Sequence, residues 1–140
     1  MIARLVRFLH ATGGASAVEF ALVLPVFAAI MVSLPDLSQA AIGALDMEAA
    51  ARASVQYAMA GGGSTDTAKS VGLQSWSDKP ADAAMSASQS CKCGAAAGVC
   101  GQNCPDGSAP QVFFTVTASG LVGGSMIHFE KSVSRTVRVQ

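Results

Sequence analysis

The sequence predicts an α+β fold in which one long N-terminal helix packs on a small antiparallel sheet that disulfides staple. Three observations support this. Residues 15–60 are mostly apolar and rich in alanine and leucine, which favours a helix. Beyond about residue 84, apolar and polar residues alternate with a period of two, which indicates strands. All four cysteines lie between Cys91 and Cys104. We therefore divide the chain into residues 1–14, a helix at 15–60 and an α+β domain at 61–140.

Composition excludes some functions. The 140 residues carry no net charge and only 13% are charged, whereas a nucleic-acid-binding protein needs a basic patch to neutralise phosphates. The mean hydropathy of +0.42 is high for a soluble domain. Aromatic residues make up 6% of the chain, so the core should be thin and in need of staples.

The first apolar stretch is long enough to cross a membrane. Glu19 is its only ionisable residue between positions 15 and 34. At about 1.5 Å per residue, this stretch matches a hydrocarbon core of about 30 Å. Arg4 and Arg7 precede it and Asp36 follows it. Because basic residues stay on the cytoplasmic side, we expect the N-terminus in the cytoplasm and the remainder outside it.

Glu19 distinguishes between interpretations of this segment. A cleaved secretory signal is one interpretation, with Ser38-Gln39-Ala40 as a small-residue cleavage site. A plain signal anchor is another. Both leave Glu19 unexplained, although a carboxylate within a membrane helix costs about 2.5–3.5 kcal/mol on insertion scales.

A third interpretation comes from the order glycine, four residues, Glu-Phe and then an apolar helix. This order, Gly14, ASAV, Glu19 and Phe20, resembles the processing site of type IV prepilins of the Flp/Tad branch. The resemblance implies that an inner-membrane prepilin peptidase cuts between Gly14 and Ala15. It also implies that Glu19 pairs with the N-terminal amine of a neighbouring subunit during assembly, with Ala15, Glu19 and Phe20 forming the assembly site.

The resemblance extends to about residue 62. AVEFALVLP at 17–25 and AAARASVQYA at 49–58 are similar to the two ends of the TadE-type domain. This implies a TadE-like pseudopilin, or minor pilin, of a Tad/Flp pilus that serves adhesion and biofilm formation. Its partners would be the prepilin peptidase, other Tad pseudopilins, the Flp major pilin, the inner-membrane assembly platform and the lipid bilayer. The C-terminal domain would lie in the periplasm.

Two other functions remain open. One is an uncleaved single-pass anchor in the inner membrane that scaffolds a pilus or secretion complex. The other is a soluble periplasmic binding module released by signal peptidase, with a mature chain that starts near Ala41. Removal of the leader after Gly14 separates the pilin interpretation from both.

The helix should continue past the membrane to Gly61-Gly62-Gly63, which ends it. Glu48 and Arg52 form an i,i+4 pair in the favoured order. Either this part packs on its own sheet, which we favour, or it forms a seam with neighbouring pilins. The apolar face that we expect consists of Ala41, Ala44, Leu45, Ala51, Val55 and Met59.

The C-terminal region should hold a short helix and three strands. Ser64 is placed to cap a helix near Thr67–Trp76. The alternating stretches predict antiparallel strands with one buried face. The strands lie near residues 85–93, 112–118 and 133–139, and the loops span 94–107 and 119–125.

The cysteines follow the pattern C-x-C-x6-C-x3-C. Two disulfides are expected because the predicted compartment is oxidising, with zinc binding or free thiols as alternatives. Cys91 and Cys93 lie on one side of a strand and should not pair with each other. Of the two remaining connectivities we prefer Cys93–Cys100 nested inside Cys91–Cys104. Each disulfide, by closing a short loop, should add about 2–3 kcal/mol to the free energy of unfolding.

No motif for catalysis, a cofactor or a metal is present, so we expect a protein that is not an enzyme but the substrate of one. Phosphate-loop, nucleophile-elbow and zinc-protease patterns are all absent from the sequence. We expect His128 to be an ordinary strand or loop residue and Trp76 to be part of the core.

Overall fold

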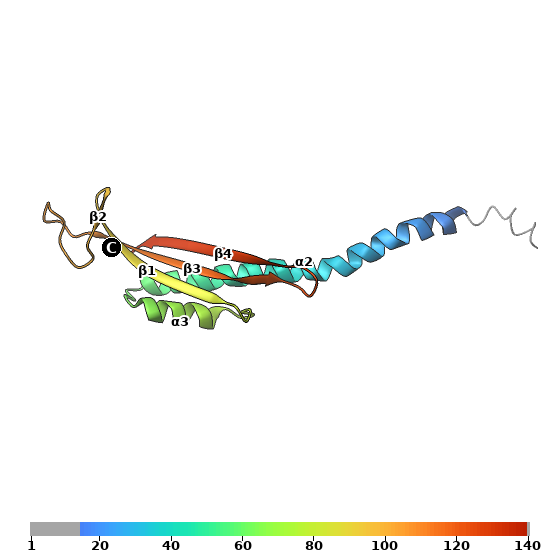
Figure 1. Cartoon of the computed structure of the whole chain (residues 1–140), viewed down its shortest axis with the longest axis horizontal. Coiled ribbons are helices and arrows are strands. Elements are labelled where there is room, and N and C mark those ends of the chain that lie inside the picture. Colours follow the sequence, from blue (N-terminus) through green and yellow to red (C-terminus); the bar gives the residue numbers. More distant parts are fainter. Residues whose placement is uncertain (1–14, 140) are drawn as a thin grey trace, which may run out of the picture.

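The computed structural model describes residues 15–139 and confirms the α+β class, with a long helix on a small antiparallel sheet (Figure 1). Two helices precede four strands. These elements are α2 (Ala15–Met59), α3 (Thr65–Ser75), β1 (Ala84–Cys93), β2 (Ala96–Gly98), β3 (Gln111–Gly123) and β4 (His128–Arg138).

The sheet has the strand order β2-β1-β3-β4, and all neighbours are antiparallel. The second half of α2 packs on β3 and β4, while α3 packs on β1 and on α2. The first half of α2 projects away from the domain, and β2 with the adjoining loop lies at the opposite end (Figure 1).

The buried face of α2 differs from the expected one. Of the predicted face only Ala51 is buried, and Leu45 and Met59 are 66% and 56% exposed. The sheet and α3 instead cover a stripe of mostly small side chains, because small residues allow closer approach of the backbones. This stripe consists of Ala40, Met47, Ala50, Ala51, Ser54 and Ala58.

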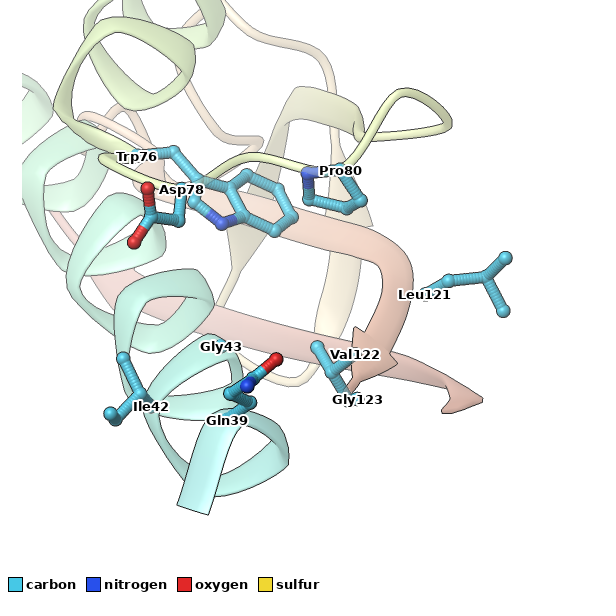
Figure 2. Close-up of a pocket in the computed structure, with 9 residues that line it drawn as sticks. All are labelled: Gln39, Ile42, Gly43, Trp76, Asp78, Pro80, Leu121, Val122 and Gly123. Atoms are coloured by element: carbon cyan, nitrogen blue, oxygen red, sulfur yellow. The ribbon is translucent and has the colours of Figure 1, made fainter. Parts of the chain in front are cut away.

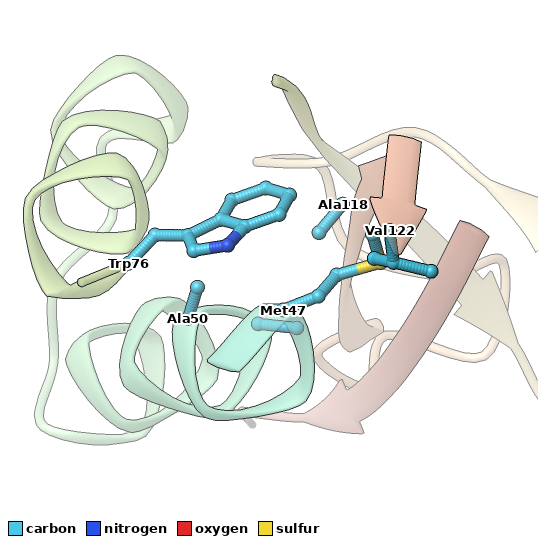
Figure 3. Close-up of a cluster of buried hydrophobic side chains, with 6 residues drawn as sticks. Met47, Ala50, Trp76, Ala118 and Val122 are labelled. Carbon is cyan, nitrogen blue, oxygen red and sulfur yellow. The ribbon is translucent and has the colours of Figure 1, made fainter. Parts of the chain in front are cut away.

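The core forms two adjoining clusters. In the first, the indole of Trp76 lies over Ala50 of α2, and Met47 extends toward Ala118 and Val122 of β3 (Figure 3). Trp76 is 2% exposed, as predicted. The second cluster consists of Ala58, Ala68, Phe114 and Val116.

Helices α2 and α3 approach each other closely around one glycine. A Cβ atom at Gly72 would overlap the Ser54 hydroxyl and the sulfur of Met85. Ser54 is fully buried, and its Oγ donates to the Ala68 carbonyl of α3 at 2.7 Å. The predicted cap at the start of α3 is confirmed, since the Ser64 side chain accepts from the Thr67 N–H at 3.2 Å.

The three predicted strands are present, although β4 begins at His128 rather than near residue 133, and two further details were wrong. The strand β2 was not predicted. Residues 119–123, predicted as loop, continue β3 to Gly123. Gly120, within this extension, serves close packing, because a Cβ there would lie 2.9 Å from Pro80 Cγ.

The sheet face away from the helices carries hydroxyl side chains on all three long strands. Thr115 and Thr136 are hydrogen-bonded at 2.9 Å, and Thr117 donates to Ser134 at 3.1 Å. Such cross-strand pairs each contribute a few tenths to about 1 kcal/mol. The polar residues that alternate with the core residues therefore stabilise the strand register themselves.

The buried face of α2 can be tested with two substitutions on the same helix. Met47→Ala should lower the free energy of unfolding by about 2–5 kcal/mol, because it leaves a cavity in the core. Leu45→Ala, the matched control, should change it by less than about 0.5 kcal/mol in the isolated chain. Denaturation of the detergent-solubilised protein, followed by Trp76 fluorescence, measures both. Equal losses would contradict the assigned face.

Candidate membrane anchor and assembly site

The first half of α2 is apolar and is not covered by the folded domain. Every side chain from Ala17 to Pro35 is exposed, including Phe20 at 66% and Leu22 at 73%. Within the described residues, α2 is the one helix long and apolar enough to cross a membrane. Exposed apolar surface of this extent is unusual in a soluble monomer. The helix therefore suggests a single-pass membrane anchor.

The predicted assembly residues lie at the start of this helix. Glu19 and Phe20 are in the second turn of α2, with both side chains exposed. Among residues 15–139, Glu19 has no hydrogen-bond or ion-pair partner. Ala15 is the first helical residue, whereas Gly14 and the leader lie outside the described residues.

A buried carboxylate marks the boundary between the exposed and covered halves of α2. Asp36 is 3% exposed, and its two oxygens accept four hydrogen bonds from the turn between β3 and β4. The donors are the N–H groups of Ser125, Met126 and Ile127, at 2.9, 2.7 and 2.8 Å, and the Ser125 hydroxyl at 3.2 Å. A Cβ atom at Gly124 would overlap this carboxylate.

These bonds set the charge state of Asp36. Burial raises the pKa of its carboxyl group, but the hydrogen bonds from Met126, Ile127 and Ser125 together outweigh burial and hold the pKa below the ordinary value of 3.8. Asp36 is therefore ionised at neutral pH. In the sequence, Asp36 is recognisable only as a charge that flanks the apolar stretch. The sequence shows an acid after the apolar stretch and, far along the chain, a Gly-Gly-Ser turn. Neither pattern reveals that the two segments meet.

Glu48 makes a second link between α2 and the sheet. It accepts from Arg52 at 3.0 Å, which confirms the predicted i,i+4 pair. It also pairs with Arg135 of β4, a partner 87 residues away that no local pattern predicts. Because these side chains are partly exposed, each pair contributes at most about 1 kcal/mol.

All four cysteines form disulfides, but the preferred nested pairing was wrong. The bonds join Cys91 to Cys100 and Cys93 to Cys104. The reason is the tight β1–β2 hairpin, in which Cys91 already faces Gly98. Cys100, two residues further, therefore lies nearer Cys91 than Cys93. The chain then turns back, and Cys104 reaches Cys93.

One pocket lies where three elements meet. It has a volume of about 440 Å³ and is bounded by α2, by the segment from Trp76 to Pro80 and by the end of β3 (Figure 2). Asp78 is the only titratable residue among those that line it. Among residues 15–139, no group of three or more His, Cys, Asp or Glu side chains could hold a metal ion.

The fold and site define a long-helix protein with an apolar anchor and a disulfide-stapled α+β domain. Residues 14–56 match the family model described as TadE-like protein. The match supports a TadE-like, pilin-related protein and suggests a relation to a Tad pilus. It includes Glu19, Asp36 and Ser54 but ends before the sheet. Searches of curated proteins and of solved structures gave no match.

The observed disulfide pairing can be distinguished from the nested one in a Gln102→Arg variant, which adds a tryptic site between Cys100 and Cys104 at an exposed position. Trypsin then yields peptides 70–92, 93–102 and 103–131. The structure predicts one three-peptide cluster under non-reducing conditions. The nested pairing would instead release 93–102 with an internal disulfide and join the other two peptides, which mass spectrometry distinguishes.

The Asp36 contact predicts a pH dependence of stability. A folded pKa below the unfolded one stabilises the protein fully above the unfolded pKa, near pH 4, and this contribution is lost as pH falls through the folded pKa. Asp36→Asn should therefore lower Tm at neutral pH and flatten the fall in Tm on acidification below about pH 4. Parallel curves for both proteins would contradict the assignment. Asp46→Asn, on the same helix, is the control.

Proposed function

We propose that the chain is a prepilin-like minor pilin that takes part in assembling a Tad/Flp pilus for adhesion and biofilm formation, and that it is not itself an enzyme. The observation that supports this most is the placement of Glu19. It sits one helical turn after Ala15, in an exposed apolar helix whose other half supports a folded domain.

The proposed mechanism begins with cleavage after Gly14 by a prepilin peptidase. The cut removes the basic leader and leaves a new ammonium group on Ala15. That ammonium pairs with the Glu19 carboxylate of a neighbouring subunit. In a medium of low dielectric constant such a pair is strongly attractive, and an unpaired charge is costly. Pairing therefore favours one register between helices, and Phe20 contributes apolar contact beside it.

The proposed topology places residues 15–34 in the inner membrane and the α+β domain in the periplasm. The two disulfides support this placement, because disulfides persist in oxidising compartments. The partners we propose are the prepilin peptidase, the Flp major pilin, other Tad pseudopilins and the assembly platform.

An uncleaved single-pass anchor that scaffolds the complex is the second candidate. One feature favours it. Processing sites of the Flp/Tad prepilins, which this sequence resembles, usually carry a basic residue before the cleaved glycine. Here Thr12 and Gly13 precede Gly14, and the nearest arginine is Arg7.

The two candidates differ in the mass of the protein extracted from membranes. Coexpression with a Tad prepilin peptidase should remove residues 1–14 and leave Ala15 at the N-terminus, as intact mass spectrometry would show. Gly14→Leu should prevent the cut. A full-length mass in the presence of active peptidase, verified on the Flp major pilin, would favour the uncleaved anchor.

The role of Glu19 is tested on the processed protein. Glu19→Ala should still be cut but should be lost from sheared pili, or should fail to support their assembly, in a strain that carries the Tad system. Glu130→Ala, an exposed acid on β4, is the matched control and should behave as wild type. Wild-type levels of pili and of incorporation with Glu19→Ala would contradict the pairing mechanism.

A further inference from the structure

The turn between β3 and β4, together with the first two residues of β4, exposes a group of apolar side chains. Met126, Ile127 and Phe129 are 59%, 53% and 48% exposed. From Gly123 to Phe129 the sequence reads GGSMIHF, and His128 is its only titratable residue. We call residues 124–129 the tip. Neither the core nor the proposed assembly site uses its apolar side chains.

The Asp36 contact fixes where the tip lies along α2. Asp36 is two residues beyond Leu34, the last residue of the proposed span, which is a rise of about 3 Å along the helix. Three tip N–H groups are bonded to its carboxylate at 2.7–2.9 Å. The tip is therefore at the level where the span would leave the hydrocarbon, and the cysteine loop is at the far end of the domain (Figure 1).

The polar groups of the tip are suited to such a place. Backbone N–H groups are costly in an apolar medium unless they are bonded. Here Asp36 binds those of Ser125, Met126 and Ile127, and the Ile127 carbonyl accepts from the Gly124 N–H at 2.9 Å. The Asp36 carboxylate is thus occupied by the tip itself, while the apolar side chains remain outside.

We propose that the tip inserts into the interfacial region of the bilayer that α2 spans, on the side of the folded domain. The occupant is lipid because the tip is bonded to the side of α2 that carries Asp36, and the apolar surface on that side continues into the span, where Val32, one turn before Asp36, is 60% exposed. The inference rests on the proposed membrane span. With two points of contact, the bilayer restricts the tilt and rotation of the domain.

Spin labels on the full chain in lipid vesicles test this. In the oxidised protein all four native cysteines are paired, so a single introduced cysteine is labelled selectively. The test position is Met126→Cys. Met59→Cys is the matched control, with a similarly exposed methionine at the far end of α2, and Leu24→Cys reports on the span. Collision with oxygen, which concentrates in lipid, is compared with collision with a water-soluble nickel chelate.

The Met126 label should show an oxygen-to-nickel ratio several-fold above that of the Met59 label and below that of the Leu24 label. Ile127→Glu in the Met126→Cys protein should bring the ratio down toward that of Met59, because a charge opposes insertion.

Other outcomes overturn the inference. A Met126 label as aqueous as the Met59 label, with the Leu24 label in lipid, refutes tip insertion and leaves the span intact. Dipolar broadening between Met126 labels without oxygen contact assigns the tip to a second copy of the chain. An aqueous Leu24 label refutes the span and the tip together.

Discussion

A single uninterrupted helix has to suit two different surroundings, and the rest of the structure follows from how it does so. Before Asp36, α2 exposes apolar side chains on all sides. After Asp36, it presents one stripe of mostly small residues to the sheet and α3. The Asp36 carboxylate lies at the boundary between these two parts and is hydrogen-bonded to a turn about 90 residues further along the chain. Because the helix is continuous, the position of the sheet relative to the anchor is set by this contact and by the packing that follows it.

The core is thin because its elements approach closely. Glycine occupies positions at which neighbouring side chains leave no room for a Cβ atom, such as Gly72 against Ser54 and Met85, and Gly120 against Pro80. Few large side chains are therefore needed, and Trp76, Phe114 and Met47 are the largest that are almost completely buried. A core of this kind gains limited free energy from apolar burial. Hydrogen bonds such as that of Ser54, hydroxyl pairs across the sheet and two disulfides contribute the remainder.

The sequence predicted features that depend on local pattern. Length and apolarity indicated the anchor, Ser64 the start of α3, and alternation the three long strands. Properties that depend on distant partners were missed or wrong. Leu45 and Met59 are apolar and helical, but nothing in their own segment shows that smaller neighbours are the ones covered. The Asp36 contact joins residues too far apart for a local pattern, and the pairing of Cys100 depended on the turn before β2. The placement of Gly14 and the leader lies outside the described residues.

The interleaved disulfides bear on the order of events during biogenesis. Synthesis delivers Cys91 and Cys93 before Cys100 and Cys104, so oxidation in order of arrival would first present two thiols that do not pair in the folded protein. Correcting such a bond requires attack by another thiolate and takes seconds to hours. The β1–β2 hairpin brings Cys100 toward Cys91 through backbone pairing alone. A chain whose hairpin closes before oxidation thus needs no isomerase, and one oxidised earlier does.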